Sequence, residues 1–242
     1  MELTRSNQQS KEETNTLDLN EFKIKFKEIR EHGFYKSLRS GPTGVGHTLE
    51  QYLGLTENNI AVPDLGAVEL KAHRDNVTSL ITLFTFNRKA WVMQPLSAIR
   101  AYGTPDQNGR LGLYFTMSQQ PNSAGLFLTV TDEVVSVQHT SGKTLVRWFT
   151  RDLSAQFHAK MPALILVTAR TEIRGDTEYF NYYRARLLTG TSPTLIADQI
   201  RRGNILIDLR LHDAITHARN HGTGFRASEG SLDELFSKVE TL

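Results

Sequence analysis

The sequence predicts a mixed α/β fold, in which helices flank a mixed β-sheet and the chain forms one compact unit. Near the start, Leu19, Phe22, Phe26 and Ile29 recur at the spacing of one helical stripe. Short β-rich segments then follow one another between residues 68 and 150. After residue 150, helical segments alternate with apolar strands, and no repeat or long linker interrupts the chain.

Capping signals and apolar periodicity define the predicted helices. The first helix opens at a capping box over residues 18–21 and ends at Gly33, because glycine readily adopts the backbone conformation that follows a helix. A second, short helix carries Leu49 and follows a glycine-rich loop at 40–46. Further helices are expected over 96–102, over 153–159, from Ser192-Pro193 to about residue 202, and after a capping box at 231–234.

Alternating or β-branched segments predict the strands. The first two, 68–72 and 79–86, are expected to pair with each other. The other expected strands are 111–117, 126–131, 134–139, 144–150, 163–169, 179–187 and 205–211. Residues 1–17 show no apolar period and are expected to form a disordered polar tail, so the folded unit spans 18–242.

Composition excludes several classes of protein. The 242 residues include 28 basic and 26 acidic side chains, a balance that allows a locally basic cleft but does not by itself indicate a nucleic-acid ligand. Because there is no cysteine, a disulfide scaffold, thiol catalysis and cysteine-based metal sites are excluded. No apolar run reaches the roughly 18 residues of a membrane helix, and the polar N-terminus is not a signal peptide. We therefore expect a cytoplasmic protein with no membrane partner.

The segment 58–71 contains the residues that most suggest chemistry. Asp64 precedes Gly66, where a turn can direct its carboxylate back toward the following strand. Glu69 and Lys71 share one face of that strand, because side chains alternate between faces. Two carboxylates and a lysine at one strand end fit a Mg²⁺ site, since this cation prefers oxygen ligands. Taken alone, the motif favours a solvated ion pair on an amphipathic strand instead.

Five segments, in the same order along the chain, resemble the MvaI/BcnI family of type II restriction endonucleases, which are relatives of MutH. They are GPTGVGHTLE at 41–50, N…PD…ELK at 59–71, SLITLFT at 79–85, IDLR at 207–210 and HGTGFR at 221–226. The resemblance runs from about residue 20 to the C-terminus and is much weaker over 88–160. It implies a PD-(D/E)XK restriction-endonuclease-like fold, a MutH-like two-lobed single chain. The catalytic lobe would centre on 41–86, and a DNA-recognition lobe would occupy about 190–242.

The resemblance also implies which residues carry out the reaction. Asp64, Glu69 and Lys71 match the catalytic PD-(D/E)XK centre, with Mg²⁺ held by Asp64, Glu69 and the carbonyl of Leu70. Glu50 matches a helix glutamate that approaches the same metal site in MutH-like enzymes. The alternative for Glu50 is an ordinary surface carboxylate on a helix.

Two further positions lie near this centre. His73 is two residues beyond Lys71 on the same strand face, within reach of the scissile phosphate, and the alternative is a histidine satisfied within an edge strand. Thr85 corresponds to a histidine that reads the central base pair in BcnI-like enzymes and to a threonine in MvaI-like enzymes. Thr85 therefore favours the MvaI branch, whose site is CC-W-GG.

A second set of residues is suited to reading DNA bases. Asp208 and Arg210 are separated by one residue on a predicted strand, so they point the same way. An arginine can donate two hydrogen bonds to guanine and a carboxylate can accept one from cytosine, so the pair can recognise a G·C base pair. The alternative is a surface ion pair that contributes little. By resemblance, Asp208, Arg210 and Arg226 match the base-reading residues of the family.

The stretch 211–224 is expected to be a polar loop. Its donors Arg219, His221 and Thr223 are candidates for contacts with bases or phosphates. His217 and His221 have the spacing of a helical zinc pair, but Gly222 argues against a helix and no third ligand is evident. The loop before Arg226 matches neither branch of the family closely, which leaves the central base pair open.

Together these observations predict a Mg²⁺-dependent type II restriction endonuclease that hydrolyses double-stranded DNA at a short CC-N-GG site, with CCWGG favoured. The resemblance implies a monomer that nicks one strand at a time, 5′-phosphate and 3′-hydroxyl products, and a partner methyltransferase that protects the host. The alternatives are a MutH-type nicking enzyme of mismatch repair and a DNA-binding module with an inert centre. The four residues between Asp64 and Glu69 argue against the first, since the MutH spacing is longer.

Overall fold

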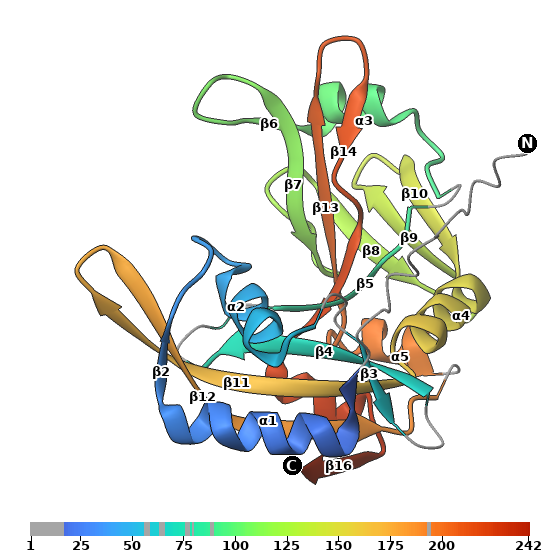
Figure 1. Cartoon of the computed structure of the whole chain (residues 1–242). Helices are drawn as coiled ribbons and strands as arrows, with labels where there is room; N and C mark the ends of the chain where they lie inside the picture. Colours follow the sequence, from blue (N-terminus) through green and yellow to red (C-terminus); the bar gives the residue numbers. More distant parts are fainter. Residues whose placement is uncertain are drawn as a thin grey trace, which may run out of the picture.

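The computed structural model describes residues 17–55, 59–62, 66–75, 78, 80–87, 90–192 and 195–242. Figure 1 shows a lower sheet with α1 lying along it, and an upper part that contains two further sheets. The lower sheet contains both parallel and antiparallel pairs, whereas the other two sheets are antiparallel. Helices flank the sheets, which confirms the predicted α/β class.

The lower sheet contains seven of the described strands. Their order is β1-β3-β4-β11-β12-β16, and β2 also pairs with β12. The bounds are β1 Leu17–Asp18, β2 Phe34–Lys36, β3 Asn59–Val62, β4 Gly66–Arg74, β11 Ala163–Arg174, β12 Thr177–Thr189 and β16 Lys238–Thr241. Two helices cover one of its faces, α1 (Leu19–His32) and α2 (Gly44–Leu53).

Strand β4 separates an apolar face from a polar one. Val68 and Leu70 are buried with Phe22 of α1 and Leu49 of α2 in a first hydrophobic core. Because side chains alternate along a strand, Glu69 and Lys71 point to the opposite face. On that face, β11 contributes Leu164 and Leu166 to a second core. The burial of Val68 and Leu70 therefore determines where the charged pair points.

The upper part consists of a six-stranded sheet and a three-stranded sheet. The six-stranded sheet has the order β5-β15-β13-β7-β6, with β14 on β13, and the other sheet has the order β10-β9-β8. The strand bounds are β5 Ile81–Thr85, β6 Thr104–Pro105, β7 Leu111–Met117, β8 Leu126–Val130, β9 Val134–His139, β10 Thr144–Phe149, β13 Leu206–Asp213, β14 Ala218–Asn220 and β15 Gly224–Ala227. The helices are α3 Pro95–Tyr102, α4 Thr150–Lys160, α5 Ile196–Arg201 and the 3₁₀ helix η2 Glu229–Glu234.

Several expected elements need correction. The predicted strands 68–72 and 79–86 do not pair, because β4 joins the lower sheet whereas β5 pairs with β15 and packs into the second core. The predicted polar loop 211–224 contains β14, which forms a hairpin with β13. The predicted start of a helix at Ser192-Pro193 falls partly outside the described residues, and α5 begins only at Ile196.

The two ends of the folded unit also differ from expectation. No α-helix follows the predicted capping box at 231–234; a 3₁₀ helix starts earlier, where the Ser228 side chain accepts a hydrogen bond from the Ser231 amide, and β16 follows. The predicted tail cannot include Leu17, which is buried in β1 beside β3, and residues 1–16 lie outside the described part. The division into a catalytic lobe at 41–86 and a recognition lobe at 190–242 stays a prediction.

A cluster of charges joins η2 to the lower sheet. Glu229 Oε1 accepts hydrogen bonds from Arg184 at 2.7 Å and from Arg186 at 2.8 Å, both on β12. Its other oxygen lies 3.4 Å from His73 Nε2 on β4. The side chains of Glu229 and Arg186 are 31% and 14% exposed, so this cluster is only partly screened by water. Glu229 lies three residues after Arg226, so it connects the end of β15 to β4 and β12.

We predict that Glu229→Gln lowers the free energy of unfolding by about 2 kcal/mol, because two arginines lose their shared carboxylate in a half-buried setting. Chemical denaturation checks this value. The control is Glu234→Gln on the same 3₁₀ helix, whose exposed side chain lies 4.0 Å from Arg202, and the expected change is under about 0.5 kcal/mol. Equal effects of the two substitutions would contradict the role assigned to Glu229.

Candidate active site and nucleic-acid interface

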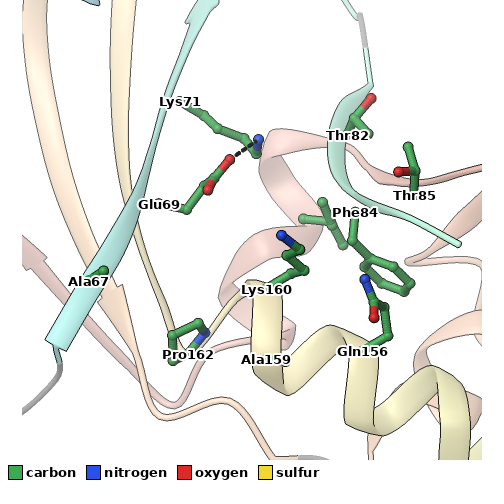
Figure 2. Close-up of a pocket in the computed structure, with 11 residues that line it drawn as sticks. Ala67, Glu69, Lys71, Thr82, Phe84, Thr85, Gln156, Ala159, Lys160 and Pro162 are labelled. Atoms are coloured by element: carbon green, nitrogen blue, oxygen red, sulfur yellow. Dashed lines mark hydrogen bonds and ion pairs between the residues drawn. The ribbon is translucent and has the colours of Figure 1, made fainter. Parts of the chain in front are cut away.

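A cavity of about 470 Å³ lies between β4, β5 and α4. Figure 2 shows the side chains that surround it, with Glu69 and Lys71 on one side and Thr82 and Thr85 on another. The lining residues are Ala67, Glu69, Lys71, Thr82, Leu83, Phe84, Thr85, Gln156, Ala159, Lys160 and Pro162. Both β4 residues predicted for catalysis therefore open on the same cavity as the predicted base-reading residue Thr85.

Glu69 and Lys71 form an ion pair within this cavity. Lys71 Nζ donates to Glu69 Oε1 at 2.8 Å, and the Lys71 and Glu69 side chains are 21% and 19% exposed. The pairing of β3 with β4 ends at Glu69, whereas β11 pairs with β4 from Glu69 to Arg74. Lys71 is therefore held from one side by β11, where it pairs with Leu166.

Glu50 on α2 lies close enough to Glu69 and Lys71 for their charges to affect its pKa. Burial raises the pKa of the Glu50 carboxyl, and the charge of Glu69 raises it further. The positive charges of His47, Lys71 and Arg39 oppose that rise in the pKa. The structure thus brings Glu50, Glu69 and Lys71 together although Glu50 comes from a different element. The alternative for Glu50 was an ordinary surface carboxylate. The partial burial of Glu50 and its proximity to Glu69 and Lys71 argue against that alternative.

The donor set fits a hard divalent cation. Glu50 and Glu69 supply carboxylate oxygens and the strand supplies backbone carbonyls such as that of Leu70, which is the ligand chemistry that Mg²⁺ prefers. Asp64, the third predicted carboxylate, lies outside the described residues. Within the described ranges, no group of three or more His, Asp or Glu side chains is arranged to hold a metal ion. The complete ligand set is therefore still a prediction.

His73 does not line the cavity. It is buried, its Nε2 lies 3.2 Å from Thr168 Oγ1, and it faces Glu229. Burial lowers the pKa of His73, although the charge of Glu229 opposes this. At His73, β4 pairs with Thr168 of β11, and these contacts support a structural role.

Asp208 and Arg226 form an ion pair on the six-stranded sheet. Arg226 Nη1 donates to Asp208 Oδ2 at 2.5 Å, and its Nη2 donates to the carbonyl of Leu80 at 2.6 Å. Thr116 on β7 donates to the other oxygen of Asp208. The surface ion pair between Asp208 and Arg210 that the sequence left open is thus replaced by one between Asp208 and Arg226.

Arg210 lies on the same face of β13 as Asp208, as their spacing predicted. Its Nε donates to the carbonyl of Gly222 at 2.9 Å. This bond fixes the plane of the guanidinium group and leaves both terminal nitrogens for another acceptor. A methyl group on Gly224 would approach Arg210 Nη2 to 3.1 Å, so glycine gives the guanidinium room at this position.

His212 and Tyr114 extend this polar face, although the sequence alone did not single out either residue. His212 Nδ1 lies 2.9 Å from the Tyr114 hydroxyl and 3.2 Å from Nε2 of the predicted residue His221. Burial lowers the pKa of His212, and the charges of Arg110 and His221 act in the same direction. The sequence could have indicated His212, because it follows Arg210 by two residues on the same strand and therefore shares its face.

The remaining predicted contacts lie around the β13–β14 hairpin. Arg219 is exposed on β14 opposite His212. Thr223 is buried, and its amide donates to Asn87. Thr85 pairs with Gly224 and so joins the six-stranded sheet to the cavity. His217 and His221 do not share a helix, which removes the spacing argument for zinc.

Comparisons with known proteins assign the chain to a family. The sequence model of the MvaI/BcnI restriction endonuclease family matches residues 23–236. The chain belongs to the MvaI/BcnI restriction endonuclease family. It is thus a site-specific deoxyribonuclease, and the expected family is confirmed. A search of curated proteins found no match.

Two solved structures resemble this MvaI/BcnI family member. The restriction endonuclease MvaI in complex with its cognate DNA substrate is 25% identical, with a TM-score of 0.75 over 96% of this chain and 99% of that one. MvaI in the absence of DNA gives a TM-score of 0.53 at the same identity, over 96% of this chain and 98% of that one. The arrangement of the present chain is therefore closer to that of the MvaI complex. Among the described helices of this family member, none is long and apolar enough to cross a membrane.

We predict that replacing Lys71 with Met raises the pKa of Glu50 further, because the substitution removes a positive charge that opposes the effect of burial. Carboxyl-carbon NMR titration of the metal-free protein, with the Glu50 signal assigned through Glu50→Gln, measures this pKa. The control is Lys27→Met on α1, which should leave the pKa of Glu50 unchanged. An unchanged or lower pKa in Lys71→Met would show that the two residues do not face each other as described.

Proposed function

We propose that this chain is a Mg²⁺-dependent type II restriction endonuclease that cuts double-stranded DNA at a CC-N-GG site, with CCWGG favoured. The observation that carries the proposal is the cavity in which Glu69 and Lys71 face Thr85 of the base-reading sheet. A catalytic strand and a polar sheet that share one cavity can engage the same stretch of duplex. The likeness to MvaI in complex with its cognate DNA substrate supports this choice of ligand.

We assign Asp64, Glu69 and the carbonyl of Leu70 as the groups that hold the cation, with Glu50 beside them. When bound, the cation would stabilise the charge that develops on the phosphate and lower the pKa of a bound water. Lys71 orients the attacking water and favours loss of its proton, and Glu69 holds the Lys71 ammonium in place. The water attacks phosphorus in line, the bond from phosphorus to the 3′ oxygen breaks, and 5′-phosphate and 3′-hydroxyl ends result.

We assign base reading to the polar face of the six-stranded sheet. Arg210 has two terminal nitrogens for the O6 and N7 atoms of a guanine, and Asp208 accepts from the N4 amino group of the paired cytosine. Arg226 holds the Asp208 carboxylate in position for this contact. Other proposed contacts come from Arg219, His221, Thr223 and Thr85, and His73 stays a candidate for a phosphate contact.

We further propose that the enzyme is a monomer in the cytoplasm. One catalytic centre on one chain cuts one strand and then rebinds in the opposite orientation to cut the second. A host that produces this enzyme needs a methyltransferase of the same specificity to protect its own sites.

Substitution of Lys71 by Ala, or of Glu69 by Gln, is expected to lower the single-turnover cleavage rate of a CCAGG duplex at least a hundredfold in Mg²⁺. Binding in EDTA should change little, because neither substitution removes a base contact. The control is Lys27→Ala on the far side of α1. Full cleavage by either variant would contradict the assignment of the catalytic cavity.

The Arg210→Lys variant is expected to lose discrimination between CCAGG and a duplex with one G·C pair reversed, by about tenfold to a hundredfold. Lysine keeps the charge but cannot make the paired hydrogen bonds. Competition binding measures the ratio of the affinities for the two duplexes. Arg151→Lys, at an exposed side chain of α4, serves as the matched control. A ratio equal to that of the wild type would remove Arg210 from the reading surface.

A further inference from the structure

The catalytic cavity holds a second lysine, Lys160, which the sequence alone did not single out. It is the last residue of α4, and Figure 2 shows its ammonium group directed toward Glu69 and Lys71. Gln156 lies four residues earlier, on the same side of the helix, and also lines the cavity. Helix α4 thus contributes one cationic side chain, Lys160, and one neutral amide, Gln156, to the cavity beside β4.

The two lysines that line the cavity differ in their protein partners. Among the described residues, the charged ones that line the cavity are Glu69, Lys71 and Lys160. Glu69 pairs with Lys71 at 2.8 Å. Across the described ranges of the chain, the Lys160 ammonium has no hydrogen bond and no ion pair with another side chain or carbonyl. Among the described residues that line the cavity, Lys160 is therefore the one cation that is not engaged by a carboxylate.

The helix itself offers no alternative site for an anion. α4 points its carboxyl end toward the cavity, where backbone carbonyls rather than amides are exposed, and this end of a helix favours cations. Any contact that α4 makes with an anion in the cavity must therefore come from a side chain. The anion that the proposed substrate brings to Glu69 and Lys71 is a phosphodiester.

We propose that Lys160 binds a phosphate of the DNA strand that is being cut, at or next to the scissile position. This inference rests on the proposed function. Lys160 supplies the charge that draws the backbone into the cavity, whereas Lys71, paired with Glu69, acts on the water. Lys160 is thus a substrate-binding residue of the catalytic cavity, contributed by the segment in which resemblance to the family was weakest.

The test measures how salt affects binding of a fluorescein-labelled CCAGG duplex in EDTA, for the wild type and for Lys160→Ala and Lys160→Arg. Loss of one phosphate contact makes the slope of log K against log salt shallower by about 0.9. We expect this change in Lys160→Ala, with about tenfold weaker binding, and a wild-type slope in Lys160→Arg. Lys27→Ala is the control for removal of a lysine remote from the cavity and should keep the wild-type slope.

A wild-type slope in Lys160→Ala, with the wild-type protein binding the duplex normally, would overturn this inference and leave the proposed function intact. A shallower slope in Lys27→Ala as well would also overturn it, because the effect would then be one of net charge. If the wild-type protein neither binds nor cuts the duplex, the proposed function fails, and this inference with it. A merely structural role of Lys160 would lower thermal stability without changing the salt slope.

Discussion

The site depends on one constraint, the two-sided burial of strand β4 inside the lower sheet. Val68 and Leu70 must face α1 and α2 to complete the first core, and strand alternation then directs Glu69 and Lys71 to the opposite face. Parallel pairing with β11 fixes the register along this stretch, with Glu69 opposite Leu164 and Lys71 opposite Leu166. A slip of one residue would bury the charged pair among apolar side chains and expose the apolar pair. The packing that stabilises the sheet therefore also positions Glu69 and Lys71, the residues proposed for catalysis.

The residues proposed for base reading and those proposed for cleavage lie on different sheets, and two connections hold these sheets together. Strand β5 belongs to the six-stranded sheet but borders the cavity that Glu69 and Lys71 line, so Thr85 belongs to the sheet and also lines the cavity. At the other end of β15, Glu229 binds arginines of β12 and faces His73 of β4. Specific side-chain contacts therefore fix the position of one sheet relative to the other. The closer likeness to MvaI with DNA than to MvaI without it agrees with an arrangement suited to holding a duplex.

Local sequence signals predicted local structure well. Strands β7 and β9 have the predicted bounds, since alternation and β-branched residues mark them directly. Pairing between distant strands was not predictable in this way: β4 and β5 are neighbours in sequence but join different sheets, because their apolar residues fill different cores. For the same reason Lys160 and His212 were missed, since their roles follow from what the fold brings opposite them. Strand alternation predicted that each motif pair of β4 and β13 shares one face, whereas the resemblance to the family assigned these residues to a site.

Sequence-specific cleavage is best tested by digestion of a sequenced plasmid in Mg²⁺, with EDTA as the control, followed by sequencing of every fragment end. We expect discrete fragments whose ends all lie within CC-N-GG sites and carry 5′-phosphates, and we expect no such fragments in EDTA. Fragment ends scattered over unrelated sequences, or a plasmid that stays intact in Mg²⁺, would contradict this expectation. Nicks confined to one strand would instead favour a partner-dependent nicking enzyme.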